Sequence, residues 1–127
     1  MRYLTLEQLL QLHALVLLKD GGLDAVRDLG RLESATASQQ QEVFGEELYA
    51  TVFEKAAALI RGIISDHAFV DGNKRTAMLA GLTLVELNRH VFRAEQGELE
   101  DFAVKIAVEH LTVGEIAAWL EAHSTVQ

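Results

Sequence analysis

Apolar residues recur at the spacing of an α-helix through the middle of the chain. Between residues 53 and 64 they fall at positions i, i+3, i+4, i+7, i+10 and i+11, which is one helix face: Phe53, Ala56, Ala57, Ile60, Ile63 and Ile64. The 127 residues include no proline, and no run of β-branched residues alternates with polar ones. Because proline interrupts helices and alternation marks strands, these patterns predict an all-α fold.

Threonine opens the first and the last of the expected helices. In each case a Gln or Glu follows three residues later, which is the spacing of a capping box. The patterns predict helices over 5–18 (ended by Gly21-Gly22), 49–65, 76–87, 99–108 and 112–123, one or two helical turns over 31–37, a mobile Ser/Gln-rich loop over 34–41 and an extended segment over 90–93.

The segment 76–87 is apolar nearly all round. Its polar residues are Thr76, Thr83 and Glu86. A helix of this kind belongs at the centre of a fold, and twelve residues are too few to cross a bilayer. We therefore expect a compact helical bundle around a buried central helix, with a polar loop immediately before it.

Composition indicates a globular protein of one domain, residues 1–127. Half of the residues are hydrophobic, and this length is enough to bury a core. The chain has no cysteine, which excludes disulfides and thiolate chemistry. A net charge of −8 argues against charge-driven binding of nucleic acid. With no signal-peptide pattern and no membrane-spanning run, we expect a cytoplasmic protein without nucleic-acid or membrane partners.

The stretch SDHAFVDGNKRTAMLAG, residues 65–81, gathers charged side chains just ahead of the buried helix. The free N–H groups and the dipole at the start of a helix attract anions. Cations are disfavoured there by about 0.3–1 kcal/mol each, so Lys74 and Arg75 make sense beside a polyanion. Gly72 lets the backbone approach a ligand closely, and Asn73 can cap the helix or donate to a phosphate oxygen.

The same stretch supplies a carboxylate and an imidazole. Asp71 would repel phosphates unless a divalent cation lay between them, and Mg²⁺ is commonly held by one or two carboxylates plus phosphates. His67 can take a proton from a hydroxyl near neutral pH. Phe69 is expected to turn inward and anchor the loop. A base, a metal carboxylate and an anion cradle are the parts needed for phosphoryl or nucleotidyl transfer.

Ordinary structural roles account for each of these residues taken singly. A histidine such as His67 at a helix end is commonly a cap, Asp71-Gly72 is a common turn pair, and Lys74 and Arg75 are compatible with solvated charges. Two cations at the unfavourable end of a helix remain unexplained by that interpretation. No third ligand follows His67 and Asp71 at short range, so no zinc site is expected. Structural or solvated roles are expected for the other histidines, His13, His90, His110 and His123.

The run HAFVDGNKR, residues 67–75, resembles the motif of the Fic/Doc family. More closely, the chain resembles the death-on-curing (Doc) branch, since VRDLGRLESA at 26–35 and FEKAAALI at 53–60 are also similar to that branch. The resemblance extends over nearly the whole chain. It implies a Fic/Doc-type helical bundle.

The resemblance also implies a role for each motif residue. His67 matches the base that activates a target hydroxyl, and Asp71 matches the acidic Mg²⁺ ligand. Gly72, Asn73 and Arg75 match the loop that binds the phosphates of ATP. In this family the chemistry is carried out on a protein target.

Two positions depart from the AMP-transferring members of the family. Lys74 stands where they have a second glycine, and Met78 stands where they have an arginine for the distal phosphates of ATP. Lysine is typical of the Doc branch, in which ATP is reversed and a threonine of elongation factor Tu is phosphorylated, although the prototype has alanine in place of Gly72. A kinase is implied first, with AMP transfer or a non-catalytic nucleotide-binding module as alternatives. The implied catalytic residues are His67, Asp71, Lys74 and Arg75, and the implied nucleotide-binding residues are Gly72, Asn73, Lys74 and Arg75.

Protein partners follow from the same resemblance. A toxin of this branch is inhibited by a separate antitoxin whose tail folds as a helix in a groove. Ser38–Glu42 fits the first five positions of the inhibitory pattern [ST]-x-x-x-E-[GN], but Val43 breaks the last, and a Gln-rich segment matches such a pattern by chance. The segment 34–48 is a candidate for docking the backbone of the target.

Overall fold

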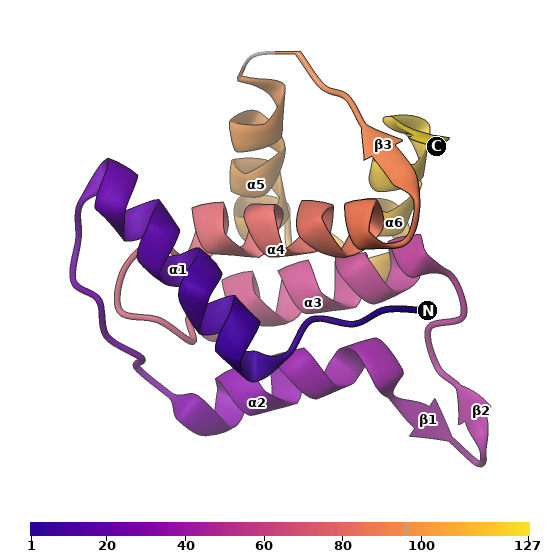
Figure 1. Cartoon of the computed structure of the whole chain (residues 1–127), viewed down its shortest axis with the longest axis horizontal. Helices are drawn as coiled ribbons and strands as arrows, with labels where there is room; N and C mark the ends of the chain where they lie inside the picture. Colours follow the sequence, from indigo (N-terminus) through magenta and orange to yellow (C-terminus); the bar gives the residue numbers. More distant parts are fainter. Residues whose placement is uncertain (96) are drawn as a thin grey trace.

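Six α-helices account for most of the residues that the structure, a computed structural model, describes, namely 1–95 and 97–127 (Figure 1). They are α1 (Leu6–Asp20), α2 (Leu29–Ala37), α3 (Val52–Asp66), α4 (Asn73–Leu87), α5 (Glu98–Glu109) and α6 (Val113–Ala122). Short pieces complete the fold: a 3₁₀ turn η1 (Ser38–Gln40) and the strands β1 (Glu42–Val43), β2 (Glu46–Glu47), β3 (His90–Phe92) and β4 (Ser124–Val126). The predicted all-α class is confirmed. Among the described residues, no helix combines the length and the hydrophobicity needed to span a membrane.

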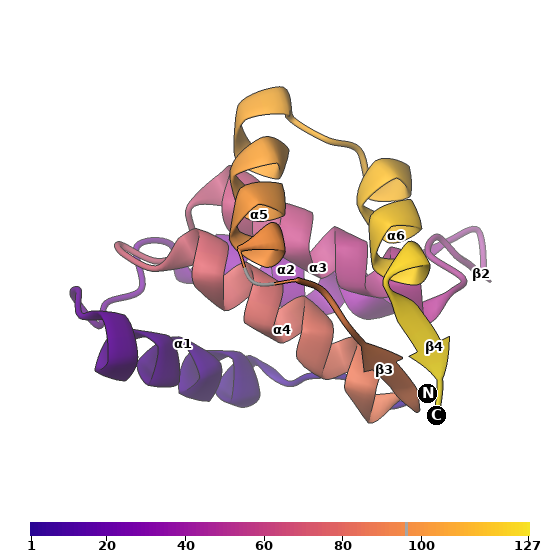
Figure 2. The same ribbon diagram turned by 90° about the horizontal axis from the view of Figure 1, so that it is seen from above.

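Helices α3 and α4 lie side by side at the centre of the molecule, joined by the loop 67–72 (Figures 1 and 2). Ten of the 15 residues of α3 and eight of the 15 residues of α4 are buried. The two helices approach closely where Gly81 faces Ile60, because a methyl group at Gly81 would overlap the Ile60 side chain. The predicted buried central helix is present as α4, and α3 shares the centre with it.

The other helices cover this central pair. Helix α1 packs against α4, α2 and α6 pack against α3, and α5 contacts both central helices. In Figure 2, α1 runs along one side of the pair, and α5 and α6 lie on the other. Strand β3 pairs antiparallel with β4, with His90 opposite Val126, which confirms the extended segment predicted near residue 90.

Capping boxes open three of the helices. Thr5 accepts the N–H of Gln8 at the start of α1, and Thr112 forms the same kind of box at the start of α6, both as predicted. Thr51 forms a third box at the start of α3, slightly later than the predicted start of that helix. Gly21 ends α1 as expected. Local signals therefore fix these helix ends.

The prediction of a mobile loop over residues 34–41 is wrong. Residues 34–37 belong to α2 and 38–40 form η1. The physical reason is Gln39, which is buried and whose side-chain amide bonds to both backbone groups of Leu4, at 2.9 and 3.0 Å. Composition cannot reveal this contact, because its two partners lie far apart in the sequence.

Candidate active site

The loop 67–72 carries the motif from the end of α3 to the start of α4. The chain between α1 and α2 pairs with this loop through its backbone. The Val70 N–H donates to the Ala25 carbonyl at 3.0 Å, and the Arg27 N–H donates to the Ala68 carbonyl at 2.8 Å. These bonds satisfy backbone groups that would otherwise lack partners, and they hold the loop against the body of the protein.

Phe69 anchors the loop from inside, as predicted. Its side chain is completely buried and stacks on the ring of His13 from α1, with ring centres 3.8 Å apart and planes 9° from parallel. His13 Nε2 donates a hydrogen bond to the Asp71 carbonyl oxygen at 2.8 Å. One buried histidine therefore supports the loop at two points.

A structural or solvated role is expected for His13. The role is structural, and its contacts place it in the site itself. It lies on the buried face of α1 together with Leu9, Val16 and Leu17. A polar ring on an apolar face needs a hydrogen-bond partner. The spacing therefore indicates a buried polar contact, although it does not identify the Asp71 carbonyl as the partner.

Asn73 closes the loop. Its Oδ1 accepts the Phe69 N–H at 2.9 Å, and its Nδ2 donates to the Phe69 carbonyl at 2.8 Å. The N-cap of α4 is Gly72, and the helix begins at Asn73, three residues before its predicted start. The prediction that Asn73 caps α4 is therefore wrong, and its contact with a phosphate stays a prediction.

His67 ends α3 through its backbone, which adopts the left-handed conformation with φ of 47°. That conformation costs roughly 1–2 kcal/mol for a residue with a β-carbon, and strain of this kind is often found at functional sites. The side chain is exposed, and it forms no hydrogen bond or ion pair with the residues that the structure describes. The backbone acts as a cap, as one interpretation of the sequence had it, while the imidazole stays available.

Helix α4 starts without a side-chain cap, because its N-cap is Gly72, with φ of 79°. The first N–H groups of a helix have no partner within the helix, and at α4 no side chain of the described residues caps them. Helix α5 also starts at an uncapped glycine, Gly97, but three acidic residues in its first turn complement the dipole. The first turn of α4 carries Lys74 and Arg75 instead.

Asp71 is exposed, and one of its carboxylate oxygens is held in place. Oδ2 accepts the Leu23 N–H at 2.8 Å. Gly22 allows this approach, because it has φ of 118° and a β-carbon there would lie only 3.2 Å from Asp71 Cβ. Oδ1 has no hydrogen-bond partner among the described residues. One carboxylate oxygen therefore orients the group, and the other is open to a ligand.

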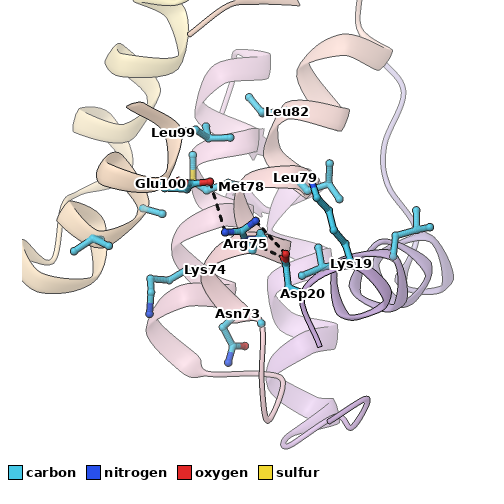
Figure 3. A pocket seen from close by; sticks show the side chains of 15 residues that line it. Lys19, Asp20, Asn73, Lys74, Arg75, Met78, Leu79, Leu82, Leu99 and Glu100 are labelled. Atoms are coloured by element: carbon cyan, nitrogen blue, oxygen red, sulfur yellow. Dashed lines mark hydrogen bonds and ion pairs between the residues drawn. The ribbon is translucent and has the colours of Figure 1, made fainter. Parts of the chain in front are cut away.

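Arg75 lies between two carboxylates (Figure 3). Its Nε is 3.1 Å from Asp20 Oδ2, and its Nη1 donates to Asp20 Oδ1 at 3.4 Å. Its Nη2 is 3.6 Å from Glu100 Oε1. Lys74 points away from Arg75 in Figure 3 and forms no ion pair with any described residue. Acids thus compensate the charge of Arg75, whereas Lys74 stays at the helix start without such a partner.

Two adjoining pockets meet at this end of α4. The smaller measures about 400 Å³, and Asp71 lines it together with the end of α1. The larger measures about 690 Å³ and lies between α1, α4 and α5 (Figure 3). Four residues line both pockets: Val16, Asp20, Gly72 and Arg75. The apolar wall of the larger pocket includes Leu15, Leu79, Leu82, Leu99 and Val104.

Comparison with known proteins gives a family. The model of the Fic/DOC family matches residues 3–85. The chain belongs to the Fic/DOC family. It is 38% identical to "Toxin Doc" of Mycolicibacterium smegmatis over 102 residues, which cover 79% of this chain and 78% of the relative. It is 33% identical to "Protein kinase doc" of Escherichia phage P1 over 118 residues, which cover 92% and 91%. The resemblance seen in the motif is therefore confirmed.

The motif residues of this Fic/DOC chain are distributed unevenly over the site. Asp71, Gly72 and Arg75 line the smaller pocket, Asn73 and Lys74 line only the larger one, and His67 lines neither. The inhibitory-type segment 38–42 lies at the other end of α3 from the motif loop (Figure 1). That distance favours the interpretation of its partial pattern as chance.

Proposed function

We propose that this chain is the toxin of a toxin–antitoxin system and acts in the cytoplasm as a protein kinase. It would transfer the γ-phosphoryl group of ATP to a threonine of a translation factor, elongation factor Tu by resemblance, and so arrest translation. The observation that carries the proposal is a single fixed loop that presents His67 and Asp71 beside the uncapped start of α4. The names of the two relatives, a toxin and a protein kinase, support it.

His67 acts as the general base in this proposal. Its exposed imidazole has no competing bond with a described residue, so a target hydroxyl can reach it. The hydroxyl proton moves to the imidazole while the hydroxyl oxygen forms a bond to the γ-phosphorus. The bond from that phosphorus to the bridging oxygen breaks, and ADP leaves. A positioned base of this kind contributes about 10²–10⁴-fold to a rate.

The start of α4 and its cations bind the phosphates. The first N–H groups of the helix supply fixed donors, and Lys74 supplies a point charge. Asp20 holds the Nε and Nη1 of Arg75, whereas the 3.6 Å contact of Nη2 with Glu100 is looser. The Nη2 edge is therefore the part of Arg75 that a phosphate would take. Donors aimed at developing charge are the main source of catalysis in phosphoryl transfer.

Asp71 would hold the Mg²⁺ that accompanies ATP. The site fits this ion, because Oδ1 has no partner among the described residues and the carboxylate lines the same pocket as Gly72. The described residues contain no group of three or more His, Cys, Asp or Glu side chains placed to share a metal. That agrees with an ion held by one carboxylate plus substrate phosphates. When bound, Mg²⁺ neutralises phosphate charge.

Met78 supports phosphoryl transfer over AMP transfer. It is buried in α4 and lines the larger pocket, where a thioether cannot fork onto phosphate oxygens. Lys74 instead adds positive charge at the helix start. Transfer of AMP remains the alternative within the family, and a non-catalytic nucleotide-binding module is the alternative outside enzymes.

The target chain would dock beside the motif loop along residues 24–27. The backbones of Ala25 and Arg27 bond to the loop, so the N–H and carbonyl of Val26 point outward and have no backbone partner among the described residues. An open edge of this kind accepts an extended peptide by backbone pairing. The hairpin within the predicted docking segment 34–48 lies at the far end of α3, so residues 24–27 are the edge nearer to the base.

The larger pocket is a candidate seat for the antitoxin tail. Its apolar wall comes from three helices, which suits the apolar face of an amphipathic helix. The pocket shares Gly72 and Arg75 with the smaller one. A tail that filled it would therefore also cover the phosphate-binding start of α4.

Mass spectrometry of elongation factor Tu tests the proposed function. The factor would be incubated with the purified chain and MgATP, and with its His67→Ala variant as a control. We expect one phosphate on a threonine with the natural chain and none with the variant. An AMP adduct would indicate the alternative transferase, and an unmodified factor would contradict the proposed target.

A further inference from the structure

Lys55, near the start of α3, is almost completely buried, with 1% of its surface exposed. Its Nζ donates to the Glu47 carboxylate and to the Gln39 backbone carbonyl, both at 2.9 Å, and lies 5.5 Å from the centre of the Tyr3 ring. A buried ammonium group persists only when it is paired and hydrogen-bonded. These bonds tie the β1–β2 hairpin firmly to the helix that ends at His67.

The hairpin of residues 42–47, called the acidic hairpin below, ends in an aromatic side chain. Phe44 is fully exposed, with φ of 52°, and Gly45 follows with φ of 81°. Positive φ at both positions is the pattern of a type I′ two-residue hairpin turn, for which Asn-Gly is the preferred sequence. A phenylalanine in that conformation costs roughly 1–2 kcal/mol. The hairpin thus keeps an aromatic ring where asparagine would fold better, which indicates that the ring has a use outside the fold.

The surface around Phe44 is acidic. Residues 32–54 contain five glutamates and no lysine or arginine. Glu42 and Glu46 are exposed and form no ion pair with the residues that the structure describes. Val43 is also exposed beside them. An exposed ring among carboxylates complements an apolar pocket that is bordered by lysines or arginines.

We propose that the acidic hairpin is a second docking site for the protein substrate, with Phe44 inserted into an apolar pocket bordered by basic residues. This inference rests on the proposed function. Lys55 and His67, the C-cap of the same helix, are twelve positions apart in the sequence, which is about 18 Å at 1.5 Å per residue. A folded protein spans that distance, whereas a nucleotide held at α4 does not. A second copy of this chain, with a net charge of −8, is a poor match for an acidic surface.

The deciding variant is Phe44→Asn. Because Asn-Gly is the preferred sequence for this turn, the variant keeps or gains stability while it loses the ring. With elongation factor Tu as the probe, we expect its KM to rise about tenfold, the usual scale for removing an interface anchor. The kcat and the affinity for MgATP should not change. Phe44→Trp keeps an aromatic ring and is the matched control.

Ionic strength gives an independent test of the charge argument. Added salt should raise the KM of the natural chain for elongation factor Tu, because it screens the contact between carboxylates and basic residues. The double variant Glu42→Gln, Glu46→Gln should show a smaller rise. An equal rise in KM in both proteins would show that the carboxylates of Glu42 and Glu46 do not contribute to docking.

Two results would overturn the second docking site. One is an unchanged KM for Phe44→Asn while the natural chain modifies its target, which would leave the proposed function standing. The other is a natural dimer that Phe44→Asn converts to a monomer, which would assign Phe44 to self-association. If the natural chain transfers nothing to elongation factor Tu, the proposed target fails and this inference fails with it.

Discussion

Arg75 in the first turn of α4 and Asp20 at the end of α1 form a two-contact ion pair, at 3.1 and 3.4 Å. Each charge lies at the helix end that disfavours it, since cations are unfavourable at an N-terminus and anions at a C-terminus. The pair offsets both costs. It also fixes one side of the guanidinium and leaves its Nη2 edge to the loosely held Glu100.

Replacing Glu100 with Gln should tighten the binding of MgATP. The carboxylate occupies the Nη2 edge that a phosphate would take, and exposed ion pairs of this kind are worth about 0.2–1 kcal/mol, which is roughly a 1.5- to fivefold change in affinity. Asp101→Asn is the matched control, because it removes the same charge from an exposed neighbour on the same helix. Calorimetric titration with MgATP measures the affinity of each variant. Equal affinities for the two variants would show that Glu100 does not compete.

Replacing His67 with Ala should lower transfer by about 10²–10⁴-fold, the contribution of a general base. Stability should change little, because the imidazole forms no bond with a described residue. His110→Ala is the control, since His110 is also an exposed C-cap residue in the left-handed conformation, with φ of 52°. Rates of target modification and melting temperatures report the two effects. Equal losses of activity in both variants would contradict the role of His67.

Replacing His13 with Phe should displace the motif loop. The variant keeps a ring against Phe69 but removes the hydrogen bond to the partly buried Asp71 carbonyl, which costs about 0.5–1.5 kcal/mol. His13→Gln places a donor near the position of Nε2 and should recover more activity, although it loses the ring stacking. Thermal unfolding and transfer rates, measured for both variants, separate the hydrogen-bonding role of His13 from its stacking role. If the Phe variant were the more active, the hydrogen bond would not be what positions Asp71.

The parts of the fold that follow from local rules could be predicted from the sequence. The capping boxes at Thr5 and Thr112, the buried helix before Asn88 and the inward Phe69 each depend on residues close together in the chain. Strand β4 could not be predicted, because three residues are too few to show a period.

The contacts that shape the site escape the sequence because they join distant segments. Nothing local links His13 to the Asp71 carbonyl, or Arg75 to Asp20. The motif shows which chemical groups are present at the loop. It does not show that Arg75 already has carboxylate partners, which is a property of how α1 and α5 pack against α4.

Stability should depend on pH through His123. Its Nδ1 donates to the Trp119 carbonyl and its Nε2 to Glu98, and these bonds raise the pKa of His123 above its ordinary 6.5, against the opposing effect of burial. Two hydrogen bonds lower the pKa of Glu98 below its ordinary 4.5. The bond from the backbone N–H of Glu95 has the larger effect, and the bond from His123 adds to it. The protonated histidine therefore stabilises the fold below pH 6.5, and this contribution is lost as the pH rises through the folded-state pKa.

The variant His123→Gln should melt roughly a few degrees below the natural chain near pH 5.5, and that gap should narrow toward pH 9. As the pH falls through the folded-state pKa of Glu98, which lies below the ordinary 4.5, the carboxylate takes up a proton and the gap in melting temperature should narrow again. Melting curves of both proteins across this pH range test the direction in which the gap changes. A gap that widened toward alkaline pH would contradict a raised pKa for His123.

Transfer of radiolabel from ATP tests the central claim most directly. The natural chain and elongation factor Tu would be incubated with ATP labelled at either the α or the γ phosphate. Because Lys74 adds charge at the start of α4 and Met78 provides no fork for distal phosphates, we predict that γ label moves to a threonine and that ADP is released. Movement of α label to the protein, with release of pyrophosphate, would contradict the kinase and restore AMP transfer.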